Sequence, residues 1–319
     1  MKALGILIIL LIFSCSHKKN NLNQLKVLTE IEKFGKDYYI NEVNDIQFSD
    51  SSYYIVDSKI NSLFLLNSDF KYITSIGRKG KGPEEFISMN AVTVTSNKFY
   101  ISDAQQNCLM CYDKDRYNLL GKITFPKNLF LNYGDFYIDD NGNVSITYIS
   151  KESSKIGMYN ISSGEFHPFN IEIQNPKDTK LYRFIGNLEE NFIAIIPRYS
   201  NKISFFSNQN YTKLGEISIV LPKESMIQWE NLIKKGKHTP LIVDGFLRGK
   251  CLYLLYQDFA NSSRALAQVK LSSNFEVIDI LFFSFPKSNG DECINVSNNT
   301  IVTFSRAKNS IQKYDHLFR

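Results

Sequence analysis

The sequence predicts an all-β fold, a six-bladed β-propeller of four-stranded blades, and three observations lead to this prediction. The first is an internal repeat: the run YYIVD at Tyr53 has a counterpart 46 residues later in FYISD at Phe99, and a period of roughly 40 to 50 residues is typical of propeller blades. The second is the recurrence of short alternating apolar runs between turn residues. The third is composition, because 13% aromatic residues with 8 prolines in 319 residues fit a packed β protein.

Residues 1–14 have the features of a secretory signal peptide. Lys2 precedes an apolar run over residues 3–13, which is too short to cross about 30 Å of hydrocarbon as a helix of roughly 20 residues. The ending IFSC resembles the bacterial lipobox. The resemblance implies that Cys15 becomes the lipidated first residue of the mature protein, held stably by several acyl chains. The alternative, a signal peptide cut elsewhere, would leave a freely soluble periplasmic protein.

Residues 15–24 would then be the lipidated cysteine and a polar tether, which is basic because it contains Lys18 and Lys19. Surface-exported lipoproteins of Bacteroidetes resemble one another in an acidic run at this point. The basic tether therefore favours an outer-membrane anchor that faces the periplasm. The formal net charge of +5 by itself diagnoses no partner. We expect the membrane as a partner through Cys15, together with an unknown protein or small anionic ligand, and no nucleic acid.

Residues 25–319 are expected to form one domain, because propellers run long as a single unit. In the first repeat, turn residues separate four predicted strands. They are expected at residues 43–48, 53–57, 62–66 and 72–77. The same pattern recurs in four more units, at about residues 91–125, 135–171, 183–220 and 241–285.

The sixth blade is predicted to combine both ends of the chain. Three strands remain at the C-terminal end, near Ile294, at residues 300–305 and at residues 310–314. The missing outer strand is then residues 25–30 (LKVLTE), which precede the first unit. This arrangement closes the ring and leaves neither terminus as a free sheet edge.

The first unit also resembles a known repeat. Residues 53–57, Asn61, residues 63–70 and the loop IGRKGKGPEEF at residues 76–86 resemble an NHL-type repeat. More specifically, they look like the six-bladed β-propeller lipoproteins of Bacteroidetes, which are NHL-repeat-like or TolB-like propellers. The resemblance is strong over the first two units and implies the fold and the anchoring rather than an activity. Glu84 stands where such loops often carry glycine.

One segment interrupts the strand pattern between the fourth and fifth blades. Residues 222–237 (PKESMIQWENLIKKGK) have apolar positions at helical spacing, so they predict a helix over residues 224–235. This helix either packs against a neighbouring blade or acts as a lid over the central opening, with Trp229 as its anchor.

The working face is expected to carry the turns between second and third strands and the loops between blades. Alignment of the units places basic residues in most of these turns. The candidates are Lys59, Lys151 with Lys155, Arg198 with Tyr199, Arg264 and Arg306, with Gln105 in the second unit and Arg78, Lys79 and Lys81 in the first interblade loop. Clustered cations attract anions, and arginine binds carboxylate or phosphate through paired donors. The alternative is that these side chains are simply solvated.

Two other features of the first units allow a functional and a structural interpretation. The loop at residues 77–83 has three glycines, but no helix follows it, so it is expected to be a turn rather than a phosphate cradle. Asp57 and Asp103 recur at the end of the second strand. Each either lines the channel, where a carboxylate could bind calcium, or caps the following turn.

The sequence contains no catalytic motif, and no catalytic residue, metal site or cofactor is predicted. Cys108 and Cys111 have zinc-knuckle spacing, but Cys251 and Cys293 are isolated and supply no second pair, so all four are expected to be buried free thiols. A disulfide between Cys251 and Cys293 stays open as an alternative in an oxidising compartment. The expected function is a membrane-anchored binding or scaffold protein of the envelope. The rival hypothesis is a propeller enzyme, such as a lyase, lactonase or hydrolase, with a metal in the central channel.

Overall fold

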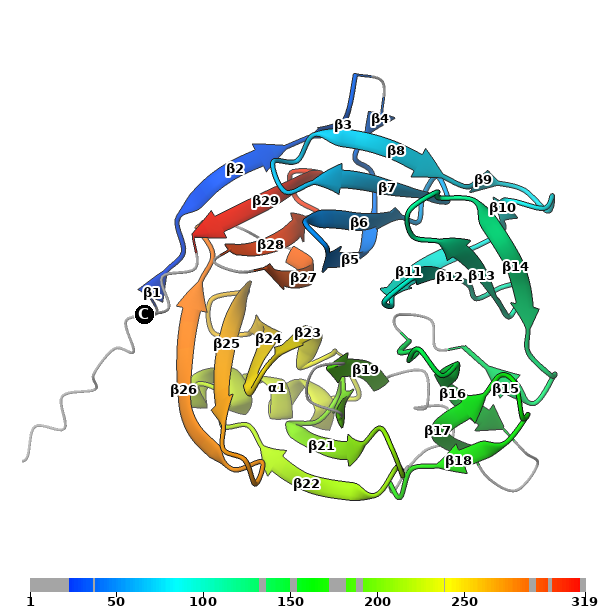
Figure 1. Cartoon of the computed structure of the whole chain (residues 1–319). Coiled ribbons are helices and arrows are strands. Elements are labelled where there is room, and N and C mark those ends of the chain that lie inside the picture. Colours follow the sequence, from blue (N-terminus) through cyan, green and yellow to red (C-terminus); the bar gives the residue numbers. More distant parts are fainter. Residues whose placement is uncertain are drawn as a thin grey trace, which may run out of the picture.

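Six β-sheets are arranged around a central axis in the computed structural model of the protein, so the predicted six-bladed propeller is confirmed (Figure 1). The structure describes residues 23–36, 38–131, 136–149, 154–171, 182–187, 192–237, 239–286, 291–297 and 300–315. The predicted signal peptide, Cys15 and most of the tether lie outside the described residues.

Blade 1 shows how the sequence forms a blade. Its strands are β5 (Val43–Ser49), β6 (Ser52–Asp57), β7 (Ser62–Asn67) and β8 (Tyr72–Ile76), each within one residue of its predicted bounds. Asp50 and Ser51 join β5 to β6 with φ angles of 47° and 63°. Two successive residues with positive φ make a tight hairpin turn whose twist matches that of the strands.

Blades 2 to 4 follow the same order, and one of their predicted bounds is wrong. Blade 3 begins at Leu129, where β15 pairs with β16, rather than near residue 135. An isolated antiparallel bridge also pairs Ile138 with Val144. The strands of these blades are β11 (Met89–Val94), β12 (Lys98–Asp103), β13 (Cys108–Asp113), β14 (Leu119–Thr124), β15 (Leu129–Phe130), β16 (Asn143–Ile149), β17 (Ser154–Asn160), β18 (Phe166–Pro168), β19 (Tyr182–Asn187), β20 (Phe192–Pro197), β21 (Lys202–Ser207) and β22 (Lys213–Ser218).

The ring closes as the sequence predicts. Blade 5 consists of β23 (Ile242–Arg248), β24 (Cys251–Asp258), β25 (Ser263–Leu271) and β26 (Val277–Ser284). Blade 6 takes β27 (Asp291–Ser297), β28 (Thr300–Ser305) and β29 (Ser310–Asp315) from the C-terminal end and β2 (Val27–Ile31) from the N-terminal end. β2 is antiparallel to β29. The Glu30 carboxylate strengthens this closure, because it accepts hydrogen bonds from Ser310 Oγ at 2.6 Å and Gln312 Nε2 at 2.8 Å.

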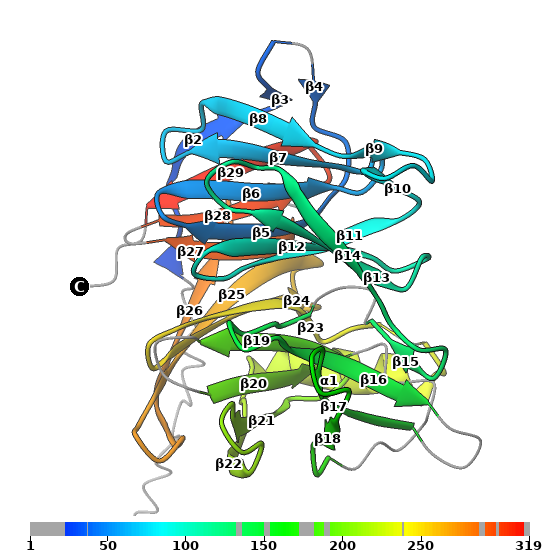
Figure 2. The same cartoon turned by 45° about the vertical axis from the view of Figure 1, so that its right-hand side comes forward.

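Three short pairings were not expected from the sequence. β1 (Asn23–Gln24) lies parallel to β26 and adds a fifth strand to blade 5. β3 (Lys33–Phe34) and β4 (Tyr38–Tyr39) form a hairpin that projects from the rim (Figures 1 and 2). β9 (Arg78–Lys79) and β10 (Glu85–Phe86) pair within the glycine-rich loop.

Apolar side chains fill the spaces between blades and form the core. The inner strands approach closely where a blade carries glycine. The Tyr137 ring of blade 3 occupies the space that a Cβ atom would need at Gly186 of blade 4. Glycine is required there because any side chain would collide with the ring.

The predicted helix is confirmed as α1 (Lys223–Lys234), and it packs against blade 5. Met226 and Trp229 contact the apolar core between blades 4 and 5. Trp229 Nε1 also donates to the carbonyl oxygen of Thr239 at 3.0 Å, and Ser225 Oγ donates to Asp258 at 2.5 Å. Trp229 thus anchors the helix to the apolar core between blades 4 and 5. No helix in the described part of the chain is long and apolar enough to span a membrane.

Candidate anion-binding site

The inner strands of neighbouring blades are joined by side-chain hydrogen bonds. Asp45 accepts from the Val92 N–H at 2.9 Å, and Asp244 accepts from the Ile294 N–H at 2.7 Å. Each of these aspartates follows a shift in strand register, after Val43 in β5 and after Ile242 in β23. The bulge lets the carboxylate reach the next blade.

These aspartates place buried carboxyl groups beside an arginine. Arg183 Nη1 in β19 lies 2.7 Å from Asp244 Oδ1, and the two side chains are 9% and 6% exposed. Burial raises the pKa of Asp244, while the positive charge of Arg183 opposes that rise. Burial also raises the pKa of Asp45 to about 7, and the charge of Asp244 adds to the effect.

Two of the predicted basic residues lie beside this ion pair. Arg198 follows β20 and Arg264 is the second residue of β25. Burial lowers the pKa of Arg198, and the positive charges of Arg183 and Arg264 lower it further. Arg183 and Arg264 are therefore both within electrostatic range of Arg198, and we call Arg183, Arg198 and Arg264 the arginine cluster. Tyr199 is close enough to act on Arg198 in the opposite direction.

Two hydrogen bonds hold the backbone of Arg198, while its side chain keeps an unused donor. Its carbonyl oxygen accepts from the N–H groups of Leu241 at 2.7 Å and Ile242 at 3.2 Å, where the chain enters blade 5. Its side-chain Nε is buried and has no hydrogen-bond partner among the described residues. A buried donor without an acceptor is costly. An anion at this point would supply the acceptor and reduce the repulsion among the three arginines.

The other predicted basic residues lie apart from the cluster. Arg78 is exposed and pairs with Glu85 at 2.9 Å, and Arg306 pairs with Glu42 at 3.0 Å. The side chains of Lys59, Lys79, Lys81 and Lys155 are exposed. Lys151 lies outside the described residues.

The glycine-rich loop binds a carboxylate of its own. Glu85 accepts from the Gly82 N–H at 2.8 Å, and this bond, with that from Arg78, lowers the pKa of Glu85. Gly77 has a φ of 85°, and its Cβ position is filled by Phe86 and Met89. These contacts are those of a turn that leads the chain into blade 2.

Asp57 and Asp103 cap turns. Asp57 is fully buried and accepts from the N–H groups of Asn41, Glu42 and Lys59 at 2.8, 3.3 and 3.2 Å. Asp103 accepts in the same way from Ile87, Ser88, Gln105 and Gln106 at 2.7 to 3.3 Å. Each carboxylate therefore joins the loop that enters its blade to the turn that follows the second strand.

The four described cysteines are free thiols, so Cys251 and Cys293 form no disulfide in this structure. Cys108, Cys111 and Cys293 are buried as predicted, whereas Cys251 is partly exposed. Within the described ranges, no three His, Cys, Asp or Glu side chains are grouped so that they could hold a metal ion.

Sequence reasoning missed Arg183, Asp45 and Asp244. A signal for the aspartates was present, because each is a charged residue within an apolar inner strand, VNDIQF in β5 and IVDGF in β23. Charged side chains are rarely buried unless paired. A charge in such a strand therefore indicates a partner, but the partner of Asp244 comes from another blade.

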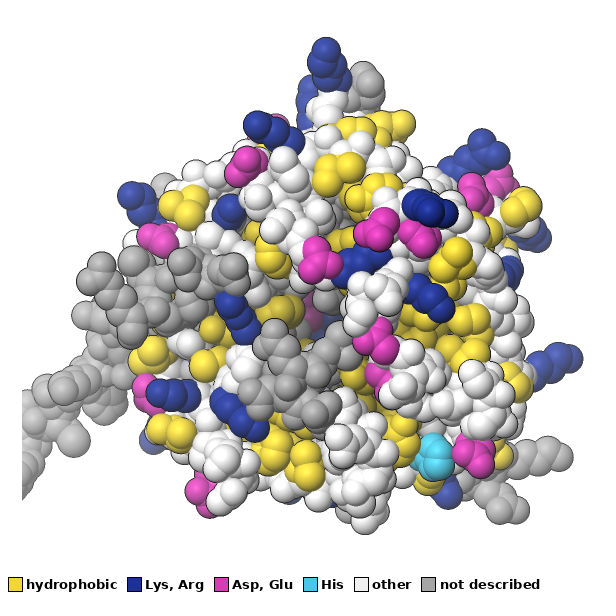
Figure 3. Space-filling view, viewed as in Figure 1, with side chains coloured by type: hydrophobic (Ala, Val, Ile, Leu, Met, Phe, Trp, Pro, Cys, Tyr) yellow, Lys and Arg dark blue, Asp and Glu magenta, His cyan; other side chains and the backbone are white. Residues whose placement is uncertain are grey.

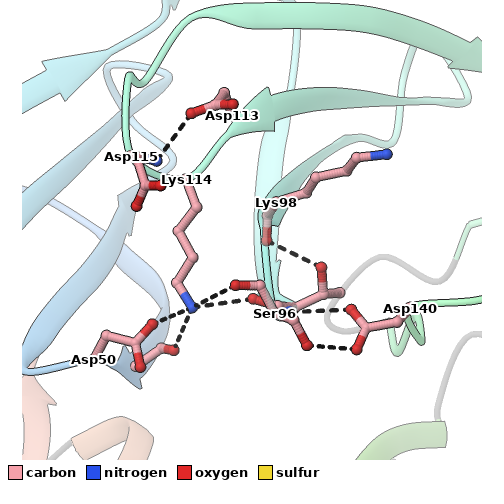
Figure 4. Close-up of polar contacts among 9 residues, drawn as sticks. Asp50, Ser96, Lys98, Asp113, Lys114, Asp115 and Asp140 are labelled. Atoms are coloured by element: carbon pink, nitrogen blue, oxygen red, sulfur yellow. Dashed lines mark hydrogen bonds and ion pairs between the residues drawn. The ribbon is translucent and has the colours of Figure 1, made fainter.

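The face opposite the predicted working face carries mixed charges. It is the face of the first-to-second strand turns, and Figure 3 shows acidic and basic side chains interspersed on it. Lys114 is 9% exposed and pairs there with Asp50. It also donates to Ser49 Oγ, the Thr95 carbonyl and the Ser96 carbonyl at 3.1, 3.1 and 3.4 Å, while Ser96 bonds to Asp140 of blade 3 (Figure 4). These contacts join the turns of three blades.

Comparison with protein families matches residues 35–219 to the family described as 6-bladed beta-propeller, DUF5128. Comparison with curated proteins gives no match.

Several solved structures share the fold. A Bacteroides fragilis protein described as exported has a TM-score of 0.64 and 14% identity over 92% of this chain and 96% of its own. A DUF4221 family member from Bacteroides vulgatus has a TM-score of 0.58 and 12% identity over 93% and 98%. A streptogramin B lyase has a TM-score of 0.53 and 13% identity over 91% and 88%. At these identities the likeness concerns the fold alone.

Proposed function

Because the chain belongs to the DUF5128 family of six-bladed β-propellers, we propose that it is a cell-envelope binding protein that holds an anionic ligand at the arginine cluster. Cys15 carries the lipid anchor, and the propeller faces the periplasm from the outer membrane. The description of the Bacteroides fragilis neighbour as exported supports an envelope location.

The arginine cluster carries this proposal. The charges of Arg183 and Arg264 lower the pKa of the central member, Arg198, and the carboxylate of Asp244 pairs with Arg183. Fixed like charges attract and orient an anion because the ligand relieves their repulsion. Paired N–H donors make carboxylates and phosphates the fitting chemical class.

Anion titrations of the wild type and two variants test the proposal. Calorimetry at low ionic strength would use citrate and sulfate as probes, since screening weakens such binding at high salt. We expect the wild type to bind at least one of them, and the double variant Arg198→Gln, Arg264→Gln to bind it more weakly by about tenfold or more. Arg183 stays intact because breaking a buried ion pair destabilises the fold.

Arg306→Gln is the matched control. Arg306 is also an arginine of a second-to-third strand turn, but its guanidinium pairs with Glu42. We expect this variant to bind as the wild type does. The proposal fails if the double variant, folded by circular dichroism, keeps full affinity, or if the wild type binds neither probe.

A further inference from the structure

A cavity lies on the rim of the propeller, away from the arginine cluster. It has a volume of about 540 Å³ and opens where β1 lies beside β26, next to the end of β29 (Figure 1). Its walls come from β24, β25 and β26 of blade 5, from Leu25 after β1 and from Asp315 of blade 6. This volume is within the usual range for small-molecule sites.

Part of the lining is apolar. Leu25 and Phe283 are buried, and Leu281 is exposed. Alternate residues of β26, namely Asp279, Leu281 and Phe283, line the cavity. Ile278 lies on the same strand, is exposed and is not part of the lining.

The rest of the lining is rich in hydrogen-bond acceptors. It contains the carboxylates of Asp279 and Asp315 and the amide of Gln268. Gln268 Nε2 donates to Tyr253 Oη at 3.3 Å, but its buried Oε1 has no partner among the described residues. Lys270 also lines the cavity, directly across from Asp279 in the strand register. The lining thus has one more carboxylate than ammonium groups, together with an unused acceptor.

We propose that this rim cavity binds a small organic cation with an apolar body, such as an arylalkylammonium ion. The ammonium group donates to Asp315 and Gln268 Oε1, and the apolar body packs against Leu281 and Phe283. An anion of the same shape is excluded because the acceptors would repel it.

Cys251 provides a reporter for occupancy. It lines the cavity and is partly exposed, whereas Cys108 and Cys293 are fully buried. Alkylation of Cys251 in the full chain by iodoacetamide, followed peptide by peptide with mass spectrometry, therefore measures access to the cavity. The buried thiols report unfolding in the same sample.

The probes are tryptamine and indole-3-propionate, which share a ring and differ in the sign of their charge. We expect tryptamine to slow the alkylation of Cys251 in a saturable way, and indole-3-propionate to leave the rate unchanged. No protection by tryptamine at about 10 mM, where a millimolar site is filled, overturns the proposal. Equal protection by both probes overturns it as well.

Substitutions on one strand locate the effect. Leu281→Trp fills the cavity, so tryptamine should no longer protect Cys251. Ile278→Trp places the same bulk on the same strand but outside the lining, and protection should persist. Asp315→Asn removes the charge to which the ammonium group donates and should weaken protection by about tenfold. If tryptamine still protects Cys251 in Leu281→Trp while the buried thiols stay unreactive, the probe binds elsewhere and the assignment is refuted.

The double variant Arg198→Gln, Arg264→Gln separates this site from the arginine cluster. In that variant, tryptamine should protect Cys251 as it does in the wild type.

Discussion

Folding buries the carboxyl group of Asp45 almost completely. Its Oδ2 accepts one hydrogen bond from the Val92 N–H, which favours the charged form, but desolvation and the nearby charge of Asp244 favour the neutral form more strongly. The raised pKa means that the folded protein holds a proton on Asp45 at a pH where the unfolded chain has lost it.

Stability should therefore depend on pH through Asp45. Between about pH 4 and pH 7 the folded state binds more protons than the unfolded state, so the free energy of unfolding falls as the pH rises through this window. The contribution of one group is at most about 1.4 kcal/mol per pH unit. We expect urea unfolding to show a smaller loss of stability between about pH 5 and pH 7 for Asp45→Asn than for the wild type.

The asparagine side chain introduced by Asp45→Asn keeps an acceptor for the Val92 N–H, so the variant isolates the charge. Asp69→Asn, in an exposed turn, is the control and should retain the wild-type dependence. An unchanged pH profile in Asp45→Asn would mean that Asp45 ionises normally in the folded protein.

Prediction at the residue scale succeeded where the chemistry was local. The turn-capping role considered for Asp57 and Asp103 follows from aspartate beside a turn, and their hydrogen bonds show it. The position of Arg198 in the turn after β20 was also predicted. Its neighbours were not, because Arg183 comes from the adjacent strand of blade 4 and Arg264 from blade 5.

At the scale of elements, Lys114 shows how a turn can hold two blades together. It lies between β13 and β14, and its ammonium group bonds to Ser49 of blade 1 and to the carbonyls of Thr95 and Ser96 in blade 2 (Figure 4). A buried carbonyl that loses its donor costs about 1–3 kcal/mol. The sequence predicted this blade at about residues 91–125, but not that one of its turn lysines would point inward.

We expect Lys114→Met to lower the free energy of unfolding by about 1–3 kcal/mol, because methionine retains the packing of the side chain but not its donors. Urea unfolding measures the difference. Lys98→Met is the control, since the Lys98 side chain is exposed on a neighbouring strand and should change stability little. A loss in Lys98→Met as large as that in Lys114→Met would contradict this account.

Strand bounds in blade 1 and the helix were predicted closely because both depend on short-range patterns. The inner strand of blade 3 was not, since β15, which pairs with Thr147 and Tyr148, has only 2 residues and is too short to show a period. β1 was also missed, because two polar residues such as Asn23 and Gln24 carry no alternation.

At the scale of the whole molecule, closure of the ring is the decisive contact. β2 pairs with β29, so blade 6 is complete only when the two ends of the chain meet. Without β2, β29 would be an exposed edge, and such edges pair with other chains.

Removal of β2 should therefore destabilise the protein and cause self-association. A chain that begins at Lys33 is expected to melt at a lower temperature than one that begins at Asn23, and to elute as larger species in size-exclusion chromatography with light scattering. The chain that begins at Asn23 keeps β1 and β2 and should stay monomeric. A stable monomer that begins at Lys33 would show that closure by β2 is dispensable.

The sequence by itself determined the propeller, its blade count and its closure, because alternation, turn residues and a repeat near 46 residues are written along the chain. Only the tertiary structure decided which charges meet. Arg183 and Asp244 are far apart in sequence, and their contact depends on the angle between blades 4 and 5 and on the bulge before Asp244. The rim cavity likewise exists only because β1 returns to β26. Local patterns specify strands, whereas sites between blades depend on packing that no single repeat contains.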